Sequence, residues 1–166
     1  DLHWANDATG WWYVCANGSD YLASGWYTIN GSDYQFGPAG YMMTGFLKRP
    51  SGEWVYADAS GTLLSGWIRD GGSWYYLDPA TNVMATGWLS QGGSWYYLGT
   101  SGDMHTGWVK VDGIWYYLTP SGAMRTGWLN LDGAWYYLGP DGGMFTGTHT
   151  INGRVYTFDE SGVWQR

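Results

Sequence analysis

Short apolar runs alternate with polar turns along the whole chain. Within residues 107–118, the runs GWVKV and IWYYL are rich in aromatic and β-branched residues, which favour strands. Asp112 and Gly113 stand between them, and Asp-Gly is a favoured pair for a two-residue turn with positive φ at both positions. The stretch after each such pair of runs carries Gly, Pro, Ser and Asp and predicts a loop. No helical periodicity interrupts the alternation, so the pattern predicts β-hairpins from end to end.

The hairpin pattern repeats every 20 or 21 residues, and the best copies read GWxxxxGxWYYLxxxGxM, as in residues 107–124. The units start near Trp4, Gly25, Gly45, Gly66, Gly87, Gly107, Gly127 and Gly147. Tight-turn pairs are expected at Asn30-Gly31, Asp70-Gly71, Asp112-Gly113, Asp132-Gly133 and Asn152-Gly153. A lone hairpin is marginal in water, whereas stacked hairpins share their buried rings along one axis. We therefore expect residues 1–166 to form one all-β hairpin solenoid of about eight repeats of ~20 residues, with irregular end units as caps.

The composition adds a binding role to this fold. Aromatic residues make up 20% of the chain, with 14 Trp and 15 Tyr, against 13% charged residues. So many rings exceed what one core can hold, and some of them should line surface clefts. The net charge is −7 and the basic residues are scattered, which argues against nucleic acid as a partner and against capture by anionic membranes. A neutral sugar or an organic cation suits such a surface better.

Paired tryptophans give the clefts a specific chemistry. Two Trp lie seven residues apart in the better units and should meet across the hairpin, beside Tyr and Met but no charged residue. Cross-strand packing explains one such pair, but its repetition at every step favours a row of identical sites. Quaternary ammonium ions donate no hydrogen bonds, and ring faces replace their hydration at about 0.5–2 kcal/mol per contact. Several weak cages on one polymer would gain affinity through avidity.

On the motif GWxxxxGxWYYLxxxGxMxTGW, the chain resembles the choline-binding modules of pneumococci and their phages. The resemblance implies a left-handed β-hairpin solenoid, an extracellular cell-wall location, and choline or phosphocholine on teichoic or lipoteichoic acid as the partner. It implies choline as the ligand and no further cofactor. Each site would take two Trp of one hairpin, the middle aromatic of the next WYY and the following Met.

The choline-binding residues implied in this way form six groups. They are Trp4, Trp11, Tyr34 and Met42; Phe46, Trp54, Tyr75 and Met84; Trp67, Trp74, Tyr96 and Met104; Trp88, Trp95, Tyr116 and Met124; Trp108, Trp115, Tyr136 and Met144; and Trp128, Trp135 and Tyr156, with Trp164 in the place of Met. The step after Trp26 departs from the motif, since Asp33, Val55 and Leu63 stand at the other three positions. We expect no choline there. The last Tyr of each WYY is expected to pack inside the solenoid, and the Leu that follows it is expected to pack under the loop.

Residues for catalysis are missing from this pattern. Glu53 and Glu160 are the only Glu and lie repeats apart, while His3, His105 and His149 lack metal-ligand spacing. We expect no catalytic residues, no metal, no membrane insertion and no signal peptide, hence a mature product or a fragment. A glucan-binding or other glycan-binding module, the anchoring part of a cell-wall hydrolase with its catalytic domain elsewhere, and an adhesin remain alternatives. The terminal repeats, with apolar Val155, Phe158 and Trp164, could cap the stack or form a homodimer.

Overall fold

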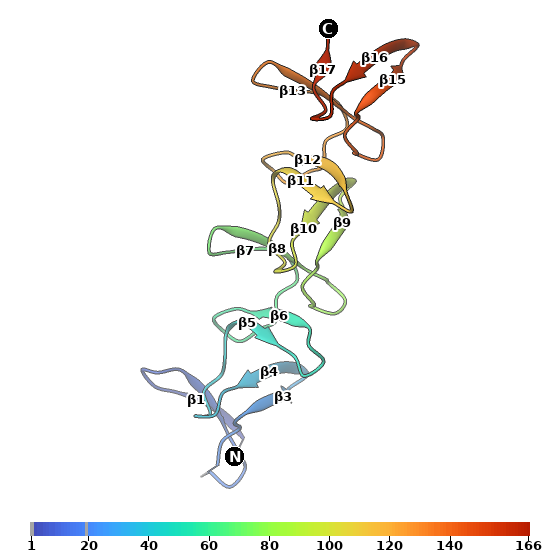
Figure 1. Cartoon of the computed structure of the whole chain (residues 1–166). Coiled ribbons are helices and arrows are strands. Elements are labelled where there is room, and N and C mark those ends of the chain that lie inside the picture. The colour runs from blue at the N-terminus through green and yellow to red at the C-terminus, as the bar shows by residue number, and fades with distance from the viewer. Residues whose placement is uncertain (1, 19) are drawn as a thin grey trace. The chain divides into compact units, whose positions relative to one another are not determined.

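A computed structural model describes residues 2–18 and 20–166, and Asp1 and Ser19 lie outside the described residues. Every regular element in this part of the chain is a strand, which confirms the predicted fold class, an all-β solenoid of hairpin repeats (Figure 1). The strands are β1 (His3–Asn6), β2 (Trp11–Val14), β3 (Gly25–Ile29), β4 (Ser32–Phe36), β5 (Gly45–Lys48), β6 (Trp54–Ala57), β7 (Gly66–Asp70), β8 (Ser73–Leu77), β9 (Gly87–Gln91), β10 (Ser94–Leu98), β11 (Gly107–Val111), β12 (Ile114–Leu118), β13 (Gly127–Leu131), β14 (Ala134–Leu138), β15 (Gly147–Ile151), β16 (Arg154–Phe158) and β17 (Trp164–Gln165).

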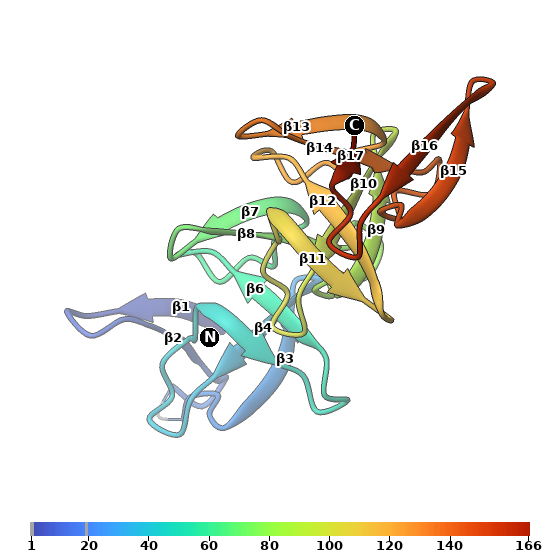
Figure 2. The ribbon, with the colours of Figure 1, turned by 45° about the horizontal axis from the view of Figure 1, so that its top comes forward.

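The chain divides into two compact units, Asp1–Ala85 with β1 to β8 and Thr86–Arg166 with β9 to β17. Each strand pair β1–β2, β3–β4 and so on to β15–β16 is an antiparallel hairpin, which gives eight hairpins within the described residues. Inside a unit, successive hairpins are turned relative to one another, as β9–β10 and β11–β12 show (Figure 2). The hairpins are therefore repeated building blocks, as their sequence spacing predicted.

Two-residue turns set the register of the hairpins. Val111 pairs with Ile114, and between them Asp112 and Gly113 have φ angles of 48° and 83°. Positive φ at both central positions matches the right-handed twist of the flanking strands, and only Gly, Asn and Asp adopt it readily. The turn predicted at Asp70-Gly71 is wrong by one residue. Asp70 ends β7 and pairs with Ser73, so Gly71 and Gly72 make that turn.

A short return of the chain completes each repeat. After β12 the loop folds back, and Met124 forms a bridge with Leu118, as Met144 does with Leu138. The Leu at this position is fully buried at 0% exposure in each of the four hairpins that carry it: Leu77, Leu98, Leu118 and Leu138. These buried residues hold each loop against its hairpin, so the loops have defined positions beside the next repeat.

The last Tyr of the WYY run packs against the first ring of its own hairpin. The pair lies directly opposite in the register, and the ring centroids are 4.9–5.2 Å apart in edge-to-face contact. The pairs are Trp4 with Tyr13, Phe46 with Tyr56, Trp67 with Tyr76, Trp88 with Tyr97, Trp108 with Tyr117 and Trp128 with Tyr137. This contact fixes the first ring of each predicted cage.

The step after Trp26 is packed differently. Trp26 lies against a small core of Leu47, Val55 and Ala57, together with Leu63. Val55 is fully buried at 0% exposure and stands where other repeats place the middle aromatic of WYY. Aliphatic packing therefore takes the place of the Tyr that the next hairpin contributes to the other pockets.

At the end of the second unit, β17 adds a third strand to β15 and β16. Phe158 is 2% exposed, and Trp164 packs on Trp128 and Tyr156. Two of the three terminal apolar residues are thus used inside the unit, which is the behaviour of a cap. Val155 alone of the three is exposed. A homodimer through this end stays a prediction.

Candidate functional site

Three pockets inside the two units share one set of walls. Each is lined by two Trp of one hairpin, a Tyr of the next hairpin and the Met that follows it. Their volumes are about 620, 410 and 360 Å³. The sets are Trp4, Trp11, Tyr34 and Met42 in the first unit, and Trp88, Trp95, Tyr116 and Met124 followed by Trp108, Trp115, Tyr136 and Met144 in the second. The structure thus brings together the members of three of the predicted groups.

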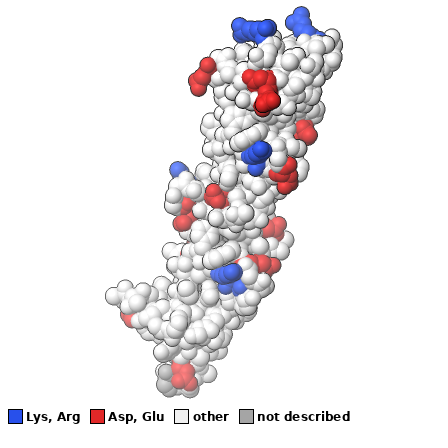
Figure 3. All heavy atoms as spheres, viewed as in Figure 1, with Lys and Arg blue, Asp and Glu red and all other residues white. Residues whose placement is uncertain are grey.

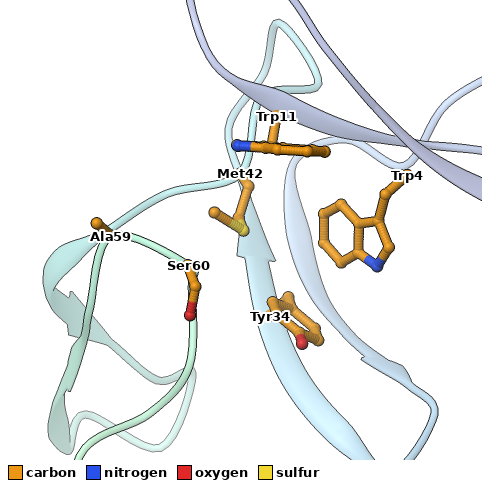
Figure 4. Close-up of a pocket in the computed structure, with 6 residues that line it drawn as sticks. All are labelled: Trp4, Trp11, Tyr34, Met42, Ala59 and Ser60. Carbon is orange, nitrogen blue, oxygen red and sulfur yellow. The ribbon is translucent and has the colours of Figure 1, made fainter.

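Figure 4 shows the arrangement in the first pocket, where the two Trp rings, the Tyr ring and the Met side chain surround one space. Trp4 and Tyr34 meet edge to face with centroids 4.9 Å apart. Trp11 is 44% exposed and forms the outer wall. The rings and the Met come from two consecutive hairpins, and Ala59 and Ser60 come from the loop of the next hairpin, so the pocket exists only where hairpins stack.

Strand geometry explains why two Trp seven residues apart form two walls of one pocket. Trp108 lies opposite Tyr117, and Trp115 lies opposite Lys110, so the two Trp are diagonal neighbours on one face of the hairpin. Their ring centroids are 6.5 Å apart and their planes are nearly perpendicular, at 89°. Tyr136 reaches Trp108 from the next hairpin at 5.1 Å. A ligand in this corner would contact rings from three directions.

A backbone hydrogen bond fixes the Met in four of the predicted groups. The Met amide donates to the carbonyl of the second Trp of the preceding hairpin, at 2.7 Å for Met124 and Trp95 and 2.8 Å for Met144 and Trp115. The same bond joins Met42 to Trp11 and Met84 to Trp54. Below the Met sulfur lies a loop Gly of the following repeat: a Cβ at Gly142 would collide with Met124 Sδ. The GxM part of the motif therefore belongs to the pocket.

The group at Phe46 is also brought together. Phe46 and Tyr75 are 4.8 Å apart, and the Met84 amide donates to Trp54 at 2.8 Å. The ammonium of Lys48 lies 5.7 Å from the Trp54 ring. This step keeps the cage geometry with a smaller first ring.

The group at the C-terminal end contains an extra ring. Trp128 lies 6.2 Å from Trp135 and 4.9 Å from Tyr156, and Trp164 packs on both Trp128 and Tyr156 at 5.8 and 5.7 Å. Trp164 therefore does stand in the place of the Met, as predicted. The guanidinium of Arg166 lies 5.5 Å from the Trp164 ring, so this site already has a cation beside it.

The remaining predicted group combines residues of both units. Trp67 and Trp74 belong to the first unit, whereas Tyr96 and Met104 belong to the second. A site at this step stays a prediction.

Two carboxylates line the pockets of the second unit, which the sequence reasoning missed. Asp141 lines the Trp88 pocket and Glu160 lines the Trp108 pocket. Both come from the loop of the hairpin two steps further along the chain, at the position that Ser60 occupies in the Trp4 pocket or next to it. The expectation that no charged residue lies beside these rings is wrong for these two pockets. The signal in the sequence was the loop position before GxM, once three repeats are laid side by side.

These carboxylates lead to a prediction about cations. Glu160→Gln should weaken binding of choline in the Trp108 pocket about three- to fivefold at low salt, because an exposed carboxylate attracts a nearby cation with about 1 kcal/mol. The loss should shrink in about 1 M NaCl, where charges are screened beyond ~3 Å. Calorimetric titration at both salt concentrations measures this. Asp132→Asn, the same charge change in an exposed turn of the same unit, should leave the affinity unchanged. An equal loss of affinity in that variant would show that Glu160 acts only through the net charge of the chain.

A pH dependence is expected in the Trp4 pocket. Asp58 precedes the pocket loop, and its Oδ1 accepts hydrogen bonds from the Ser60 hydroxyl and from the amides of Ser60 and Thr62. The Ser60 hydroxyl first, and then the two amides, lower the pKa of this carboxyl from 3.8. The ionised Asp58 carboxylate stabilises the pocket loop above pH 3.8, and this stabilisation is lost as the pH falls through the lowered pKa. Choline affinity at Trp4, followed by the indole NMR signal, should therefore fall severalfold on acidification. An Asp58→Asn variant that keeps the full pH dependence would contradict this.

Stacked hairpins with an aromatic pocket at successive steps define a repeat-type ligand-binding module. A family model described as a choline-binding repeat matches residues 64–106 and 105–146, together half of the chain. The chain belongs to the choline-binding repeat family.

Solved structures agree with this assignment. Choline binding protein F of Streptococcus pneumoniae is 36% identical with a TM-score of 0.79, and the match covers 93% of this chain and 55% of that one. CbpJ of the same organism is 36% identical with a TM-score of 0.80, over 99% of this chain and 58% of CbpJ. The autolysin LytC, also from S. pneumoniae, is 27% identical with a TM-score of 0.65, over 99% of this chain and 39% of LytC. The chain thus spans little more than half the length of the two choline-binding proteins. The comparison with curated proteins gave no match.

On the face in Figure 3, most atoms belong to uncharged residues, and acidic and basic side chains lie scattered among them. Among residues 2–18 and 20–166, no helix has the length and apolar character that a membrane crossing requires.

Proposed function

We propose that this chain is a binding module that holds choline groups in the aromatic pockets between consecutive hairpins and thereby anchors its protein to a choline-bearing wall polymer. One observation carries the proposal: the same enclosure of two Trp, one Tyr and one Met recurs at Trp4, Trp88 and Trp108. A recurring cage of one composition fits a ligand that recurs along a polymer.

The chemistry of the cage matches a trimethylammonium group. Such a group has no hydrogen to donate, so it gains little from polar walls and much from ring faces and a thioether. The rings offer contacts of about 0.5–2 kcal/mol each, and Asp141 or Glu160 adds an attractive charge in two pockets. The sum for three rings corresponds to an affinity in about the millimolar range for one free choline.

Anchoring follows from repetition. A polymer that carries many choline groups engages several pockets at once, and the effective concentration of the second group is about millimolar or higher when the spacing fits. The partner is then choline or phosphocholine on teichoic or lipoteichoic acid, and the location is the outer surface of a cell wall. The family and the similarity to two pneumococcal choline-binding proteins support this part of the proposal.

A titration of the intrinsic Trp fluorescence with choline tests the proposal, with ethanolamine and glucose oligomers as controls. We expect a saturable change with choline in about the millimolar range and none with ethanolamine, whose ammonium is better hydrated and smaller. A response to glucose oligomers without a response to choline would refute choline binding and assign the pockets to glycan recognition.

A further inference from the structure

One hairpin of the first unit lacks the ring that closes the others. In β3–β4 the first ring, Trp26, lies opposite Gln35 in the register. Six other hairpins place a Tyr at this position, packed against the first ring at 4.9–5.2 Å. An amide fills much less space than a phenol ring. A cavity of about 400 Å³ lies here, on the hairpin step for which no choline site is expected.

The walls of this cavity differ from those of the choline pockets. Trp26 and Met43 contribute apolar surface, and Gln35, Lys48 and Arg49 contribute polar groups. Lys48 and Arg49 are adjacent, and together they are two of the seven basic residues of an acidic chain. Within the part of the chain that the structure describes, neither of them forms an ion pair; the ion pair found there joins His105 and Asp103. A cavity lined by two cations suits an anion.

Two of the polar groups are prepared for a ligand. Gln35 Oε1 is buried and has no hydrogen-bond partner among the described residues, and a buried oxygen left in that state costs free energy that a hydroxyl donor would recover. The guanidinium of Arg49 donates one N–H to the carbonyl of Thr81 at 3.2 Å. This bond orients the group and leaves its other N–H donors for a ligand.

We propose that this cavity, here called the Trp26 cavity, binds a sugar phosphate. The indole of Trp26 offers an apolar face to a sugar ring, the amide of Gln35 bonds a hydroxyl, and Lys48 with Arg49 bind the phosphate. A volume of about 400 Å³ lies within the range of small-ligand pockets. A quaternary ammonium is disfavoured by the two cations, so the ligand class is opposite in charge to that of the choline pockets. The proposal stands without choline binding, because it uses none of the residues of those pockets.

The test is an NMR titration of the full chain with ¹⁵N-labelled Trp, in which the indole signal of Trp26 is assigned from a Trp26→Phe variant. Glucose 1-phosphate should shift this signal in a saturable way with a Kd in about the millimolar range. Glucose and inorganic phosphate should each bind about tenfold more weakly, because each makes half of the contacts. If inorganic phosphate shifts the signal as strongly as glucose 1-phosphate does, the site is a simple anion site and the sugar part is wrong.

Two variants make the result specific to this cavity. Arg49→Gln should weaken glucose 1-phosphate about tenfold, and Gln35→Tyr should abolish the shift, because it restores the ring that closes six other hairpins. Both variants should keep the circular dichroism spectrum of the wild-type chain, which shows that they are folded. A Trp26 shift that survives both substitutions, or the absence of any shift at about 50 mM glucose 1-phosphate, would overturn the proposal.

Discussion

Replacing Trp108 by Ala should abolish measurable choline binding in its pocket, with a loss of about thirtyfold or more in affinity for the free ligand. Trp108 contacts the other rings at this site. Its ring centroid lies 6.5 Å from that of Trp115, 5.1 Å from that of Tyr136 and 5.2 Å from that of Tyr117. Its removal takes away one ring face and loosens two others. Calorimetric titration of the variant with choline measures the loss of affinity.

The effect on a choline-bearing surface should be larger than the effect on free choline. Retention there depends on several pockets at once, so loss of one pocket removes its share of the effective concentration as well, about tenfold or more. Release of the bound module by excess free choline reports this directly. If Trp108→Ala weakened free choline but left retention on the surface unchanged, binding through several pockets would be refuted.

A graded control separates the ring from the fold. Trp108→Phe keeps an aromatic face, and Phe46 already holds the equivalent place in the first unit, 4.8 Å from Tyr75. This variant should keep most of the affinity, within about fivefold of the wild-type value. A loss equal to that of the Ala variant would show that the site needs the indole and that ring contact alone is an incomplete account.

Replacing Leu138 by Ala should destabilise the second unit by about 2–5 kcal/mol, the largest effect on stability that we expect from a single side chain. Leu138 is fully buried at 0% exposure and bridges to Met144, the Met of the Trp108 pocket. Its truncation leaves a cavity beneath the loop that carries this Met. Denaturant unfolding monitored by circular dichroism measures the free energy of unfolding.

The matched control lies in the preceding hairpin of the same unit. Ile114 is 45% exposed, so Ile114→Ala removes a similar apolar side chain from the surface and should cost less than about 1 kcal/mol. Equal destabilisation by both variants would contradict the view that the buried Leu of each repeat holds the loop against its hairpin.

Much of this fold could be predicted because the determinants are local. Asp112 and Gly113 need positive φ, GWVKV and IWYYL favour strands, and the seven-residue spacing of Trp108 and Trp115 fixes them as diagonal neighbours on one face. Each of these follows from a few residues, and the repeat multiplies it. At Asp70 the same reasoning placed the turn one residue early, because Gly71 and Gly72 fit a turn with two positive φ values better than Asp-Gly does.

The parts that could not be predicted are those where three repeats meet. Asp141 and Glu160 reach their pockets from the hairpin two steps further along the chain. A pattern within one repeat does not predict a contact over that sequence separation. The Trp26 cavity likewise arises because Gln35 lacks the ring that its six counterparts have. Gln35 looks like an ordinary strand residue until the structure shows that each counterpart is a Tyr packed on the first ring of its hairpin. When the hairpins stack, a residue that differs from its counterparts in other repeats changes the lining of one pocket.

The central claim, that the aromatic pockets hold a trimethylammonium group, is tested most directly by intermolecular NOEs from the methyl protons of choline to the indole protons of the chain. The structure predicts NOEs to both Trp of a pocket and to its Tyr and Met, as at Trp88, Trp95, Tyr116 and Met124. Saturable choline binding with NOEs to other surfaces alone, or no choline binding at all, would contradict the account.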